Sequence, residues 1–203
     1  MMEVNRILEL QIAYAAAANV PIIRAREAAA FSRIIHERNP RVVLELGTAI
    51  GYSALFIAAA APEAEIYTVE SSRNMAEKAK EYFAMADPET RDRIHLLEGD
   101  AGEFLACWSK GKKIDVAFLD AAKGQYPDYW RKLQPLLSDG AVVLADDVLY
   151  HGYVEGPYKD HVPRRQRTIA KRLREYIQMI TTDPSYETEI LREGDGLAVS
   201  RKL

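Results

Sequence analysis

Short apolar runs alternate with amphipathic helical segments along most of the chain, and this alternation limits the possible folds more than any other feature. Residues 41–46 (RVVLEL) form a short β-branched run that ends at a glycine, so we predict a buried strand there. Residues 165–180 instead place apolar side chains on one helical stripe. Strands that alternate with helices predict an α/β fold, with a parallel sheet and helices on both of its faces. The predicted strands are 41–46, 65–69, 94–97, 114–119 and 141–145, and the predicted helices include 51–61, 74–86, 126–137 and 165–180.

The two ends of the chain depart from this alternation. The first forty residues are helical in pattern, with a break near Asn19-Val20-Pro21. The last eighteen residues predict two strands joined around Gly194-Asp195-Gly196, which is a hairpin signal. The length of 203 residues favours a single domain over 1–203, in which residues 1–40 form an N-terminal helical extension.

Composition excludes several classes of protein. Hydrophobic residues make up 48% and charged residues 28% of the chain, as in ordinary soluble proteins, and no apolar run is long enough to span a membrane. The N-terminus carries no secretion signal, and a single cysteine, Cys107, excludes an internal disulfide, so we expect a cytoplasmic protein. The net charge of -3 predicts no global attraction to nucleic acid, although a local basic patch remains open.

The end of the first predicted strand is the first candidate for ligand binding, because open parallel sheets bind ligands at the carboxyl ends of their strands. The sequence there is Glu45-Leu46-Gly47-Thr48-Ala49-Ile50-Gly51-Tyr52-Ser53. Its glycines allow a sharp turn and a close approach to a ligand. Ala49 occupies the second glycine position of the dinucleotide fingerprint, which weakens a nicotinamide interpretation and suits a cofactor without phosphates.

The next two strand ends also carry suitable residues. Glu70 ends the second strand and could accept both hydroxyls of a ribose. Gly99-Asp100-Ala101 follows the third strand, in a position to flank a purine ring. The alternative for each is a plain strand–turn–helix connection with a surface acid, but three such ends together argue against it.

Carboxylates gather at the remaining strand ends. The fourth strand ends in Asp120-Ala121-Ala122-Lys123 and the fifth in Asp146-Asp147. Three carboxylates at adjacent strand ends repel one another unless a cation neutralises them, and oxygen-only ligands favour magnesium or calcium. Each aspartate could instead cap a helix, although this explains the adjacent pair and the nearby lysine less well. The four histidines lack the paired spacing of a zinc site, and His151 fits a loop histidine.

Taken in order, these motifs resemble the cation-dependent O-methyltransferases, the family that contains the catechol and caffeoyl-CoA methyltransferases. The resemblance runs from about Asn19 to the C-terminus. It implies a Rossmann-like, seven-stranded, mostly parallel sheet with a C-terminal antiparallel hairpin, and S-adenosylmethionine as methyl donor. Within the family, DAAKGQY, DDVLYHG and GDGLAVS are most similar to the bacterial tRNA 5-hydroxyuridine methyltransferases. The segments that carry the likeness are VVLELGTAIGYSA, YTVE, FLDAAKGQY, LADDVLYHG and GDGLAVS.

The resemblance also implies roles for individual residues. Val20 matches a family residue that touches the methionine end of the cofactor, and Lys123 matches the catalytic lysine. The metal ligands would be Asp120, Asp146 and Asp147, with Mg²⁺ as the ion and Mn²⁺ as an alternative; Asp120 also counts among the catalytic residues. The expected cofactor pocket consists of Val20, Glu45, Gly47, Thr48, Ser53, Glu70, Asp100, Ala101 and Asp120.

Two positions depart from the family pattern. The third metal ligand is usually asparagine, and the aspartate here, Asp147, leaves three carboxylates and a dication with a charge of -1. We therefore expect tighter metal binding and a less acidified substrate hydroxyl. Ala198 stands where catechol enzymes carry a glutamate that contacts the second catechol hydroxyl, so catechol is disfavoured as substrate.

The expected chemistry is attack of a substrate oxygen on the sulfonium methyl. Metal binding lowers the pKa of a hydroxyl and fixes its position. We expect Lys123 to accept the proton, with its pKa lowered toward neutrality by the nearby metal and sulfonium charges. The alternative is a lysine that only pairs with an aspartate.

The substrate remains open between tRNA and a small phenol. Arg24 and Arg26 lie near the expected active-site entrance, and Tyr126, Tyr150 and Tyr153 could stack on a flipped wobble base. The rival substrate is a small catechol-like or acyl-CoA-linked phenol, and a rival of another class is a non-catalytic binding module. Family members commonly pair through their N-terminal helices, so we expect a homodimer. A cationic cluster that could bind phosphates, or could simply be a solvated helix face, comprises Arg164, Arg165, Arg167, Lys171, Arg172 and Arg174.

Overall fold

The computed structural model describes residues 2–23, 25–108 and 111–203, without the side chains of residues 25–27. Arg24 and the side chain of Arg26, which we placed near the active-site entrance, therefore lie outside the described part of the chain. The chain divides into two compact units, Met1–Ala101 and Gly102–Leu203. Among the described residues, no helix combines the length and the apolar character that crossing a membrane requires.

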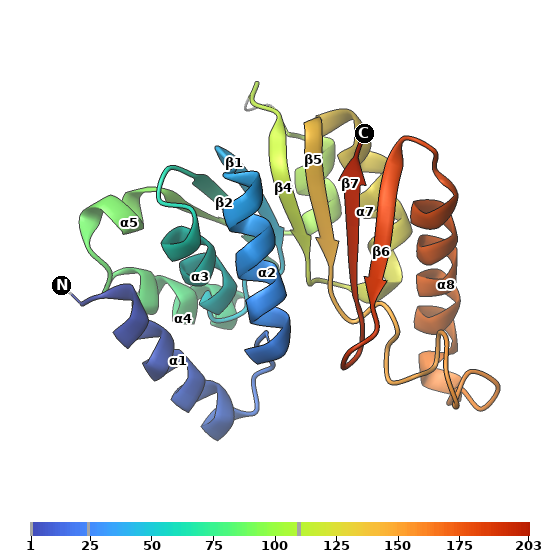
Figure 1. Ribbon diagram of the computed structural model, residues 1–203. Helices are drawn as coiled ribbons and strands as arrows, with labels where there is room; N and C mark the ends of the chain where they lie inside the picture. Colours follow the sequence, from blue (N-terminus) through green and yellow to red (C-terminus); the bar gives the residue numbers. More distant parts are fainter. Residues whose placement is uncertain (1, 24, 109–110) are drawn as a thin grey trace. The chain divides into compact units, whose positions relative to one another are not determined.

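The first unit contains three parallel strands in the order β3-β2-β1. All five residues of β1 are buried, as its β-branched sequence predicts. α2 lies over one face of these strands (Figure 1), α4 contacts β2 and β3, and α1 and α2 pack on α3. The elements are α1 (Val4–Ala18), α2 (Ala25–Arg38), β1 (Val42–Leu46), α3 (Tyr52–Ala60), β2 (Glu65–Glu70), α4 (Arg73–Phe83), α5 (Pro88–Asp92) and β3 (Ile94–Glu98).

The predicted break in the N-terminal helical region has a local cause. α1 ends at Ala18, and the C-cap residue Asn19 adopts a left-handed conformation with φ of 53°. Asparagine is one of the few residues that tolerate this conformation, and a proline two residues later cannot continue the helix. The break in the helix therefore falls at the position that we predicted from the sequence.

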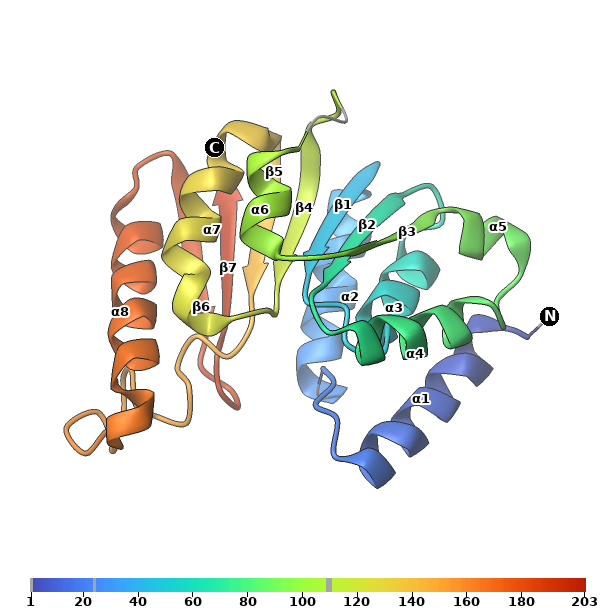
Figure 2. The same cartoon turned by 180° about the vertical axis from the view of Figure 1, so that it is seen from behind.

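The second unit contains four strands in the order β4-β5-β7-β6, with β4 and β5 parallel and the β6–β7 hairpin antiparallel. Figure 2 shows α6, α7 and α8 on one face of these strands. The elements are α6 (Ala101–Ala106), β4 (Ile114–Leu119), the 3₁₀ helix η1 (Lys123–Gln125), α7 (Tyr126–Leu133), η2 (Gln134–Leu136), β5 (Leu137–Ala145), η3 (Arg164–Gln166), α8 (Arg167–Thr182), β6 (Tyr186–Leu191) and β7 (Leu197–Lys202).

Aromatic rings fill the space between the helices and strands of this unit. Tyr126 and Trp130 of α7 contact Tyr176 of α8 edge to face, with ring centroids 5.4 and 6.1 Å away. Trp130 also contacts Tyr186 of β6 at 4.6 Å. The rings of α7 and α8 are fully buried, and they fix both helices against the strands that carry the predicted metal ligands.

The α/β class with mostly parallel strands and a terminal antiparallel hairpin is confirmed. The boundaries differ in two regions, and the first is the helix predicted over 74–86, which ends at Phe83. The predicted helix 126–137 ends at Leu133, because Pro135 cannot continue an α-helix and the chain instead forms η2. The fifth strand begins at Leu137 rather than at 141.

Candidate active site

The loop after β1 turns sharply, and its glycines are required for this turn. Gly47 and Gly51 have φ of 101° and 81°. A Cβ atom on Gly51 would lie 2.5 Å from the ring of Phe83, so no larger residue fits there. The amides of Gly47 and Thr48 both donate to the carbonyl of Val69, at 2.9 and 3.2 Å, which fixes the loop to the end of β2.

Three buried polar side chains lie beneath this loop. The Thr68 hydroxyl donates to Glu45 Oε2 at 2.5 Å, and it lies 2.5 Å from the Thr48 hydroxyl. Glu45 is fully buried, so its structural role is to anchor the loop, and a direct contact with a cofactor stays a prediction. We did not single out Thr68 from the sequence, although a polar residue inside the apolar run EIYTVE was a signal.

Glu70 also contributes to this corner of the first unit. Its carboxylate accepts hydrogen bonds from the amides of Ala49 and Ser72, at 2.8 and 2.7 Å. Its backbone carbonyl accepts from the amide of Gly99 at 2.8 Å, so the ends of β1, β2 and β3 meet here. Each carboxylate oxygen has a second lone pair, which leaves Glu70 able to accept the hydroxyls of a ribose.

The other predicted cofactor residues take different positions in this unit. Ser53 is buried in the first turn of α3. Asp100 is exposed directly after β3, and Ala101 beside it is buried. The amide of Val20 donates to Ala15 within the end of α1, and no hydrogen bond among the described residues joins Val20 to the corner at Glu70.

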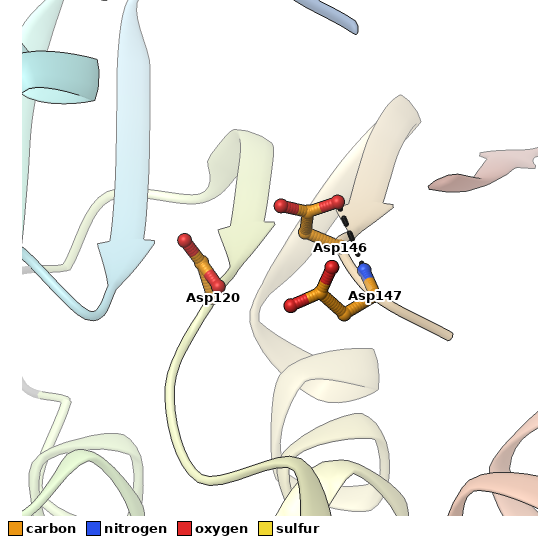
Figure 3. Close-up of side chains that lie close together, drawn as sticks. All are labelled: Asp120, Asp146 and Asp147. Atoms are coloured by element: carbon orange, nitrogen blue, oxygen red, sulfur yellow. Dashed lines mark hydrogen bonds between the residues drawn. The ribbon is translucent and has the colours of Figure 1, made fainter. Parts of the chain in front are cut away.

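In the second unit, the three predicted metal ligands lie together (Figure 3). One carboxylate oxygen each from Asp120, Asp146 and Asp147 falls within 4.8 Å of the other two. Asp120 follows β4 and the other two follow β5, which pairs directly with β4. Oxygens on opposite sides of a Mg²⁺ ion lie about 4.2 Å apart, twice the usual metal–oxygen distance. The donor set and its spacing therefore fit one hard divalent cation after a small side-chain rotation.

Lys123 is the positive partner of this cluster. Its Nζ lies 2.5 Å from Asp120 Oδ1 and 3.3 Å from Asp147 Oδ2, and its side chain is only 13% exposed. Lys123 opens the 3₁₀ helix η1, three residues after Asp120, and this tight turn folds the ammonium group back over the strand end. The sequence predicted that this lysine lies beside the acidic residues, and the structure agrees.

The environment shifts the pKa values of this lysine and of Asp120. Burial raises the pKa of Asp120, and the charge of Lys123 opposes this only in part. Burial alone would lower the pKa of Lys123, but Tyr126, Asp120 and Asp147 outweigh it, and the net shift is upward. Because burial also raises the pKa of Tyr126 well above its usual value, that phenol is neutral and the carboxylates carry the effect on Lys123.

Tyr126 is a structural residue rather than a surface for base stacking. It is fully buried, and its hydroxyl lies 2.8 Å from the carbonyl of Leu119 and 3.1 Å from that of Asp146. The suggestion that Tyr126 stacks on a flipped base is therefore wrong, because α7 and α8 enclose its ring. The hydroxyl instead links the ends of β4 and β5 and so sets the spacing of the acidic cluster.

The segment after Asp147 is held by the tip of the C-terminal hairpin. The amides of Val148 and Leu149 donate to the carbonyls of Gly196 and Asp195, at 3.0 and 2.7 Å. The amide of His151 donates to the Asp195 carboxylate at 2.8 Å. The sequence predicted the hairpin but not these contacts, which join positions more than forty residues apart.

Backbone geometry shows why this support matters. Asp147, Tyr150 and His151 all have positive φ, at 55°, 42° and 56°. Tyrosine in this conformation is strained, so the surrounding bonds have to hold it. The fit against the hairpin is close, since a Cβ atom on Gly196 would lie 2.5 Å from Leu149 Cγ.

The predicted cationic cluster separates into two groups. Arg172 is bound within the fold, because it donates to Asp128, Glu175 and the carbonyl of Gly124. Within the described ranges the guanidinium of Arg174 donates only to backbone carbonyls, and Lys171 is exposed. The residues of the cluster that stay accessible are Arg164, Arg165, Arg167, Lys171 and Arg174.

Comparison with known proteins gives the class to which this fold and site belong. A family model described as O-methyltransferase matches residues 5–203, so the chain belongs to the O-methyltransferase family. The chain is 28% identical over 176 residues to a caffeoyl-CoA O-methyltransferase of Populus kitakamiensis, covering 85% of this chain and 74% of the relative. It is 26% identical over 190 residues to a flavonoid 3',5'-methyltransferase of Vitis vinifera, covering 91% and 79%.

Similar solved structures support the same family assignment. A Staphylococcus aureus protein provisionally named a caffeoyl-CoA O-methyltransferase has a TM-score of 0.87 at 31% identity, covering 97% of this chain and 92% of its own. The Podospora anserina methyltransferase PaMTH1, solved with S-adenosylhomocysteine, has a TM-score of 0.80 at 26% identity, covering 98% and 87%. The Rossmann-like fold is confirmed, and the chain is an S-adenosylmethionine-dependent O-methyltransferase of the caffeoyl-CoA type.

Proposed function

We propose that this methyltransferase depends on a divalent cation, held by Asp120, Asp146 and Asp147. The observation that carries the proposal is the gathering of three carboxylates within 4.8 Å at the ends of two paired strands. Mg²⁺ is the favoured ion and Mn²⁺ the alternative, because the donors are all oxygens. When bound, such a cation lowers the pKa of a substrate hydroxyl and holds its oxygen in place.

Lys123 is the proposed proton acceptor. Its Nζ is held beside Asp120 and Asp147, and its low exposure limits competition from water. To accept a proton, the amine has to be neutral, whereas the carboxylates raise its pKa. When those carboxylates share their negative charge with a dication, this upward contribution falls, and a cationic sulfonium nearby lowers the pKa further.

The proposed substrate is 5-hydroxyuridine at the wobble position of tRNA. Its 5-hydroxyl and neighbouring carbonyl offer the same vicinal oxygen pair as a catechol. Two observations support it over catechol: accessible cations precede and open α8, and Ala198 is a buried residue opposite Ala145 that offers no carboxylate. The small-phenol alternative is supported by the plant relatives, whose names refer to caffeoyl-CoA and flavonoids.

A non-catalytic binding module is the third candidate. It would keep the fold but would have no use for a lysine placed against an acidic cluster. We also propose that the chain acts in the cytoplasm and that it forms a homodimer. Sedimentation of the purified protein would check the homodimer.

The test combines metal binding with methyl transfer. Asp146→Asn keeps the size of the side chain but removes one charge, and we expect Mg²⁺ affinity measured by calorimetry to fall by at least about tenfold. Lys123→Met should leave Mg²⁺ and cofactor binding intact and reduce methyl transfer by about 10²–10⁴-fold. Full activity in a chelator would refute the cation dependence, and near-normal turnover of Lys123→Met would refute its role as proton acceptor.

Mass analysis of nucleosides identifies the substrate. Incubation with hydroxyuridine-containing tRNA should yield the methylated nucleoside, whereas caffeoyl-CoA and free catechols should react poorly. The reverse order of rates would establish the small-phenol alternative. If the protein bound cofactor and metal but transferred no methyl group to any acceptor, the non-catalytic binding module would be the remaining interpretation.

A further inference from the structure

A cationic cavity lies beside the first turns of α8, apart from the acidic cluster. It has a volume of about 380 Å³. α8 contributes Arg167, Lys171 and Arg174, which share one face of the helix because they are spaced four and three residues apart. The preceding segment contributes Lys159, and the full lining is Lys159, Asp160, Val162, Arg167, Lys171 and Arg174.

The charges of this cavity are largely uncompensated. Four cations and one carboxylate line it, and in the part of the chain that the structure describes none of these cations forms a salt bridge. Arg172, on the adjacent face of α8, contrasts with them because Asp128 and Glu175 neutralise it. Gathering four cations in a chain of net charge -3 costs repulsion that a bound anion would relieve.

Two of the arginines also shape the cavity wall. Arg174 donates to the carbonyls of Tyr153, Val154 and Lys159, at 2.5, 3.1 and 3.1 Å. Arg167 donates to the carbonyl of Val162 at 3.2 Å. These bonds order the segment while leaving both guanidinium charges in place. Lys159 and Lys171 are exposed, and their ammonium groups form no hydrogen bond with the part of the chain that the structure describes, which leaves both groups available to a ligand.

The cavity is connected to the proposed metal site through the chain itself. The segment that begins with Asp146 and Asp147 continues through Tyr153 and Val154, which Arg174 binds, to the cavity wall. Tyr158 precedes Lys159 and is 57% exposed, so its ring is accessible for stacking. Tyr158 does not itself line the cavity, but an exposed ring next in sequence to a lining cation is compatible with stacking on a base, as in sites for single-stranded nucleic acid.

We propose that this cavity binds a phosphate group of the methyl acceptor. The inference rests on the proposed function only for the identity of the molecule that carries the phosphate. Two acceptors supply this chemistry: an RNA, through its backbone, and an acyl-CoA, through its phosphates. The cations neutralise the phosphate, and the adjoining segment positions the rest of the acceptor relative to the acidic cluster.

The experiment measures binding directly, in chelator and without S-adenosylmethionine. The probes are a short RNA hairpin, followed by fluorescence anisotropy, and coenzyme A, followed by calorimetry. The test variant is the double replacement Lys159→Glu and Lys171→Glu, which leaves Arg167 and Arg174 to order the segment. The matched control is Lys112→Glu together with Lys113→Glu, which reverses two exposed cations outside the cavity that, among the described residues, form no salt bridge. Circular dichroism checks that both variants are folded.

We expect the double variant to weaken binding of the acceptor probe by about tenfold or more, and the control variant by less than about twofold. For RNA, the slope of log affinity against log salt should also become shallower by about 1 to 2. Loss of RNA binding alone assigns the phosphate to RNA, and loss of coenzyme A binding alone assigns it to an acyl-CoA. Equal effects of the two variants on both probes would overturn the proposal.

The outcome is independent of catalysis. Weakened binding in the double variant would support the cavity even if the wild type transferred no methyl group to any hydroxylated acceptor. Conversely, equal binding by the double variant and its control, with methyl transfer intact, would remove the cavity proposal and leave the proposed function standing.

Discussion

Two buried tyrosines of the second unit show how a single hydroxyl can matter for the site. The Tyr126 hydroxyl lies within hydrogen-bond distance of the carbonyls of Leu119 and Asp146, each next to or part of the acidic cluster. The Tyr176 hydroxyl is equally buried but has no partner among the described residues. Their rings are 5.4 Å apart, so the two residues share one environment and differ mainly in what the hydroxyl does.

Replacing each tyrosine with phenylalanine tests this difference. Tyr126→Phe removes a buried hydrogen bond, and we expect it to lower the free energy of unfolding by about 1 kcal/mol and to weaken Mg²⁺ binding severalfold. Tyr176→Phe removes an unpaired polar atom, so it should be neutral or stabilising, with metal affinity unchanged. Urea unfolding and calorimetry measure both effects. Equal metal affinities in the two variants would show that the Tyr126 hydroxyl does not set the spacing of the carboxylates.

At the scale of elements, the β6–β7 hairpin supports the segment that follows β5. Its tip accepts hydrogen bonds from Val148, Leu149 and His151, and Gly196 packs against Leu149 without space for a side chain. The hairpin therefore positions the segment that carries two of the proposed metal ligands and begins about fifty residues earlier in the sequence.

Gly196→Ala should disturb this support. Its cost combines a left-handed alanine, about 1 kcal/mol, with overpacking of about 1–3 kcal/mol, and we expect weaker Mg²⁺ binding as the segment shifts. Gly140→Ala is the matched control: Gly140 has a similar φ of 66°, but a Cβ atom there meets nothing within 4 Å. Thermal unfolding and calorimetry compare the two. If Gly140→Ala weakened metal binding as much, the contact with Leu149 would not be the cause.

The same scale shows what the sequence could and could not predict. Strand ends are visible as apolar runs followed by glycine or acid, so the meeting of Asp120, Asp146 and Asp147 was predictable. The start of β5 was missed because Ser138-Asp139-Gly140 has the composition of a turn, yet the strand continues through it as an irregularity between Leu137, which pairs with Ile114, and Val142, which pairs with Val116. The hairpin contacts and the position of Tyr126 depend on tertiary packing, which no local pattern encodes.

For the whole molecule, buried tyrosines link stability to alkaline pH. Burial raises the pKa values of Tyr126 and Tyr176, whereas in the unfolded chain both ionise near pH 10. The folded protein therefore retains protons that the unfolded chain releases, and stability falls as the pH rises above about 10. Below that pH both forms are protonated, and these groups cause no pH dependence.

We expect the two tyrosines together to remove about 2.7 kcal/mol of stability per pH unit above pH 10, about 1.36 kcal/mol from each. Tyr176→Phe should reduce this slope by about half of that amount, because it deletes one of the two groups. Urea unfolding between about pH 9 and 11.5 gives the slopes. Identical slopes for wild type and Tyr176→Phe would contradict the assignment.

The left-handed backbone at Asp147 has a consequence for how enzymes of this kind diversify. With φ of 55°, the position favours aspartate and asparagine, two side chains of almost equal shape that differ by one unit of charge. If the proposed cation binds here, a single base change in the codon can therefore alter its affinity and the acidity of the substrate oxygen while the turn stays as it is. At this one position the charge of the side chain can change without a change in the backbone conformation.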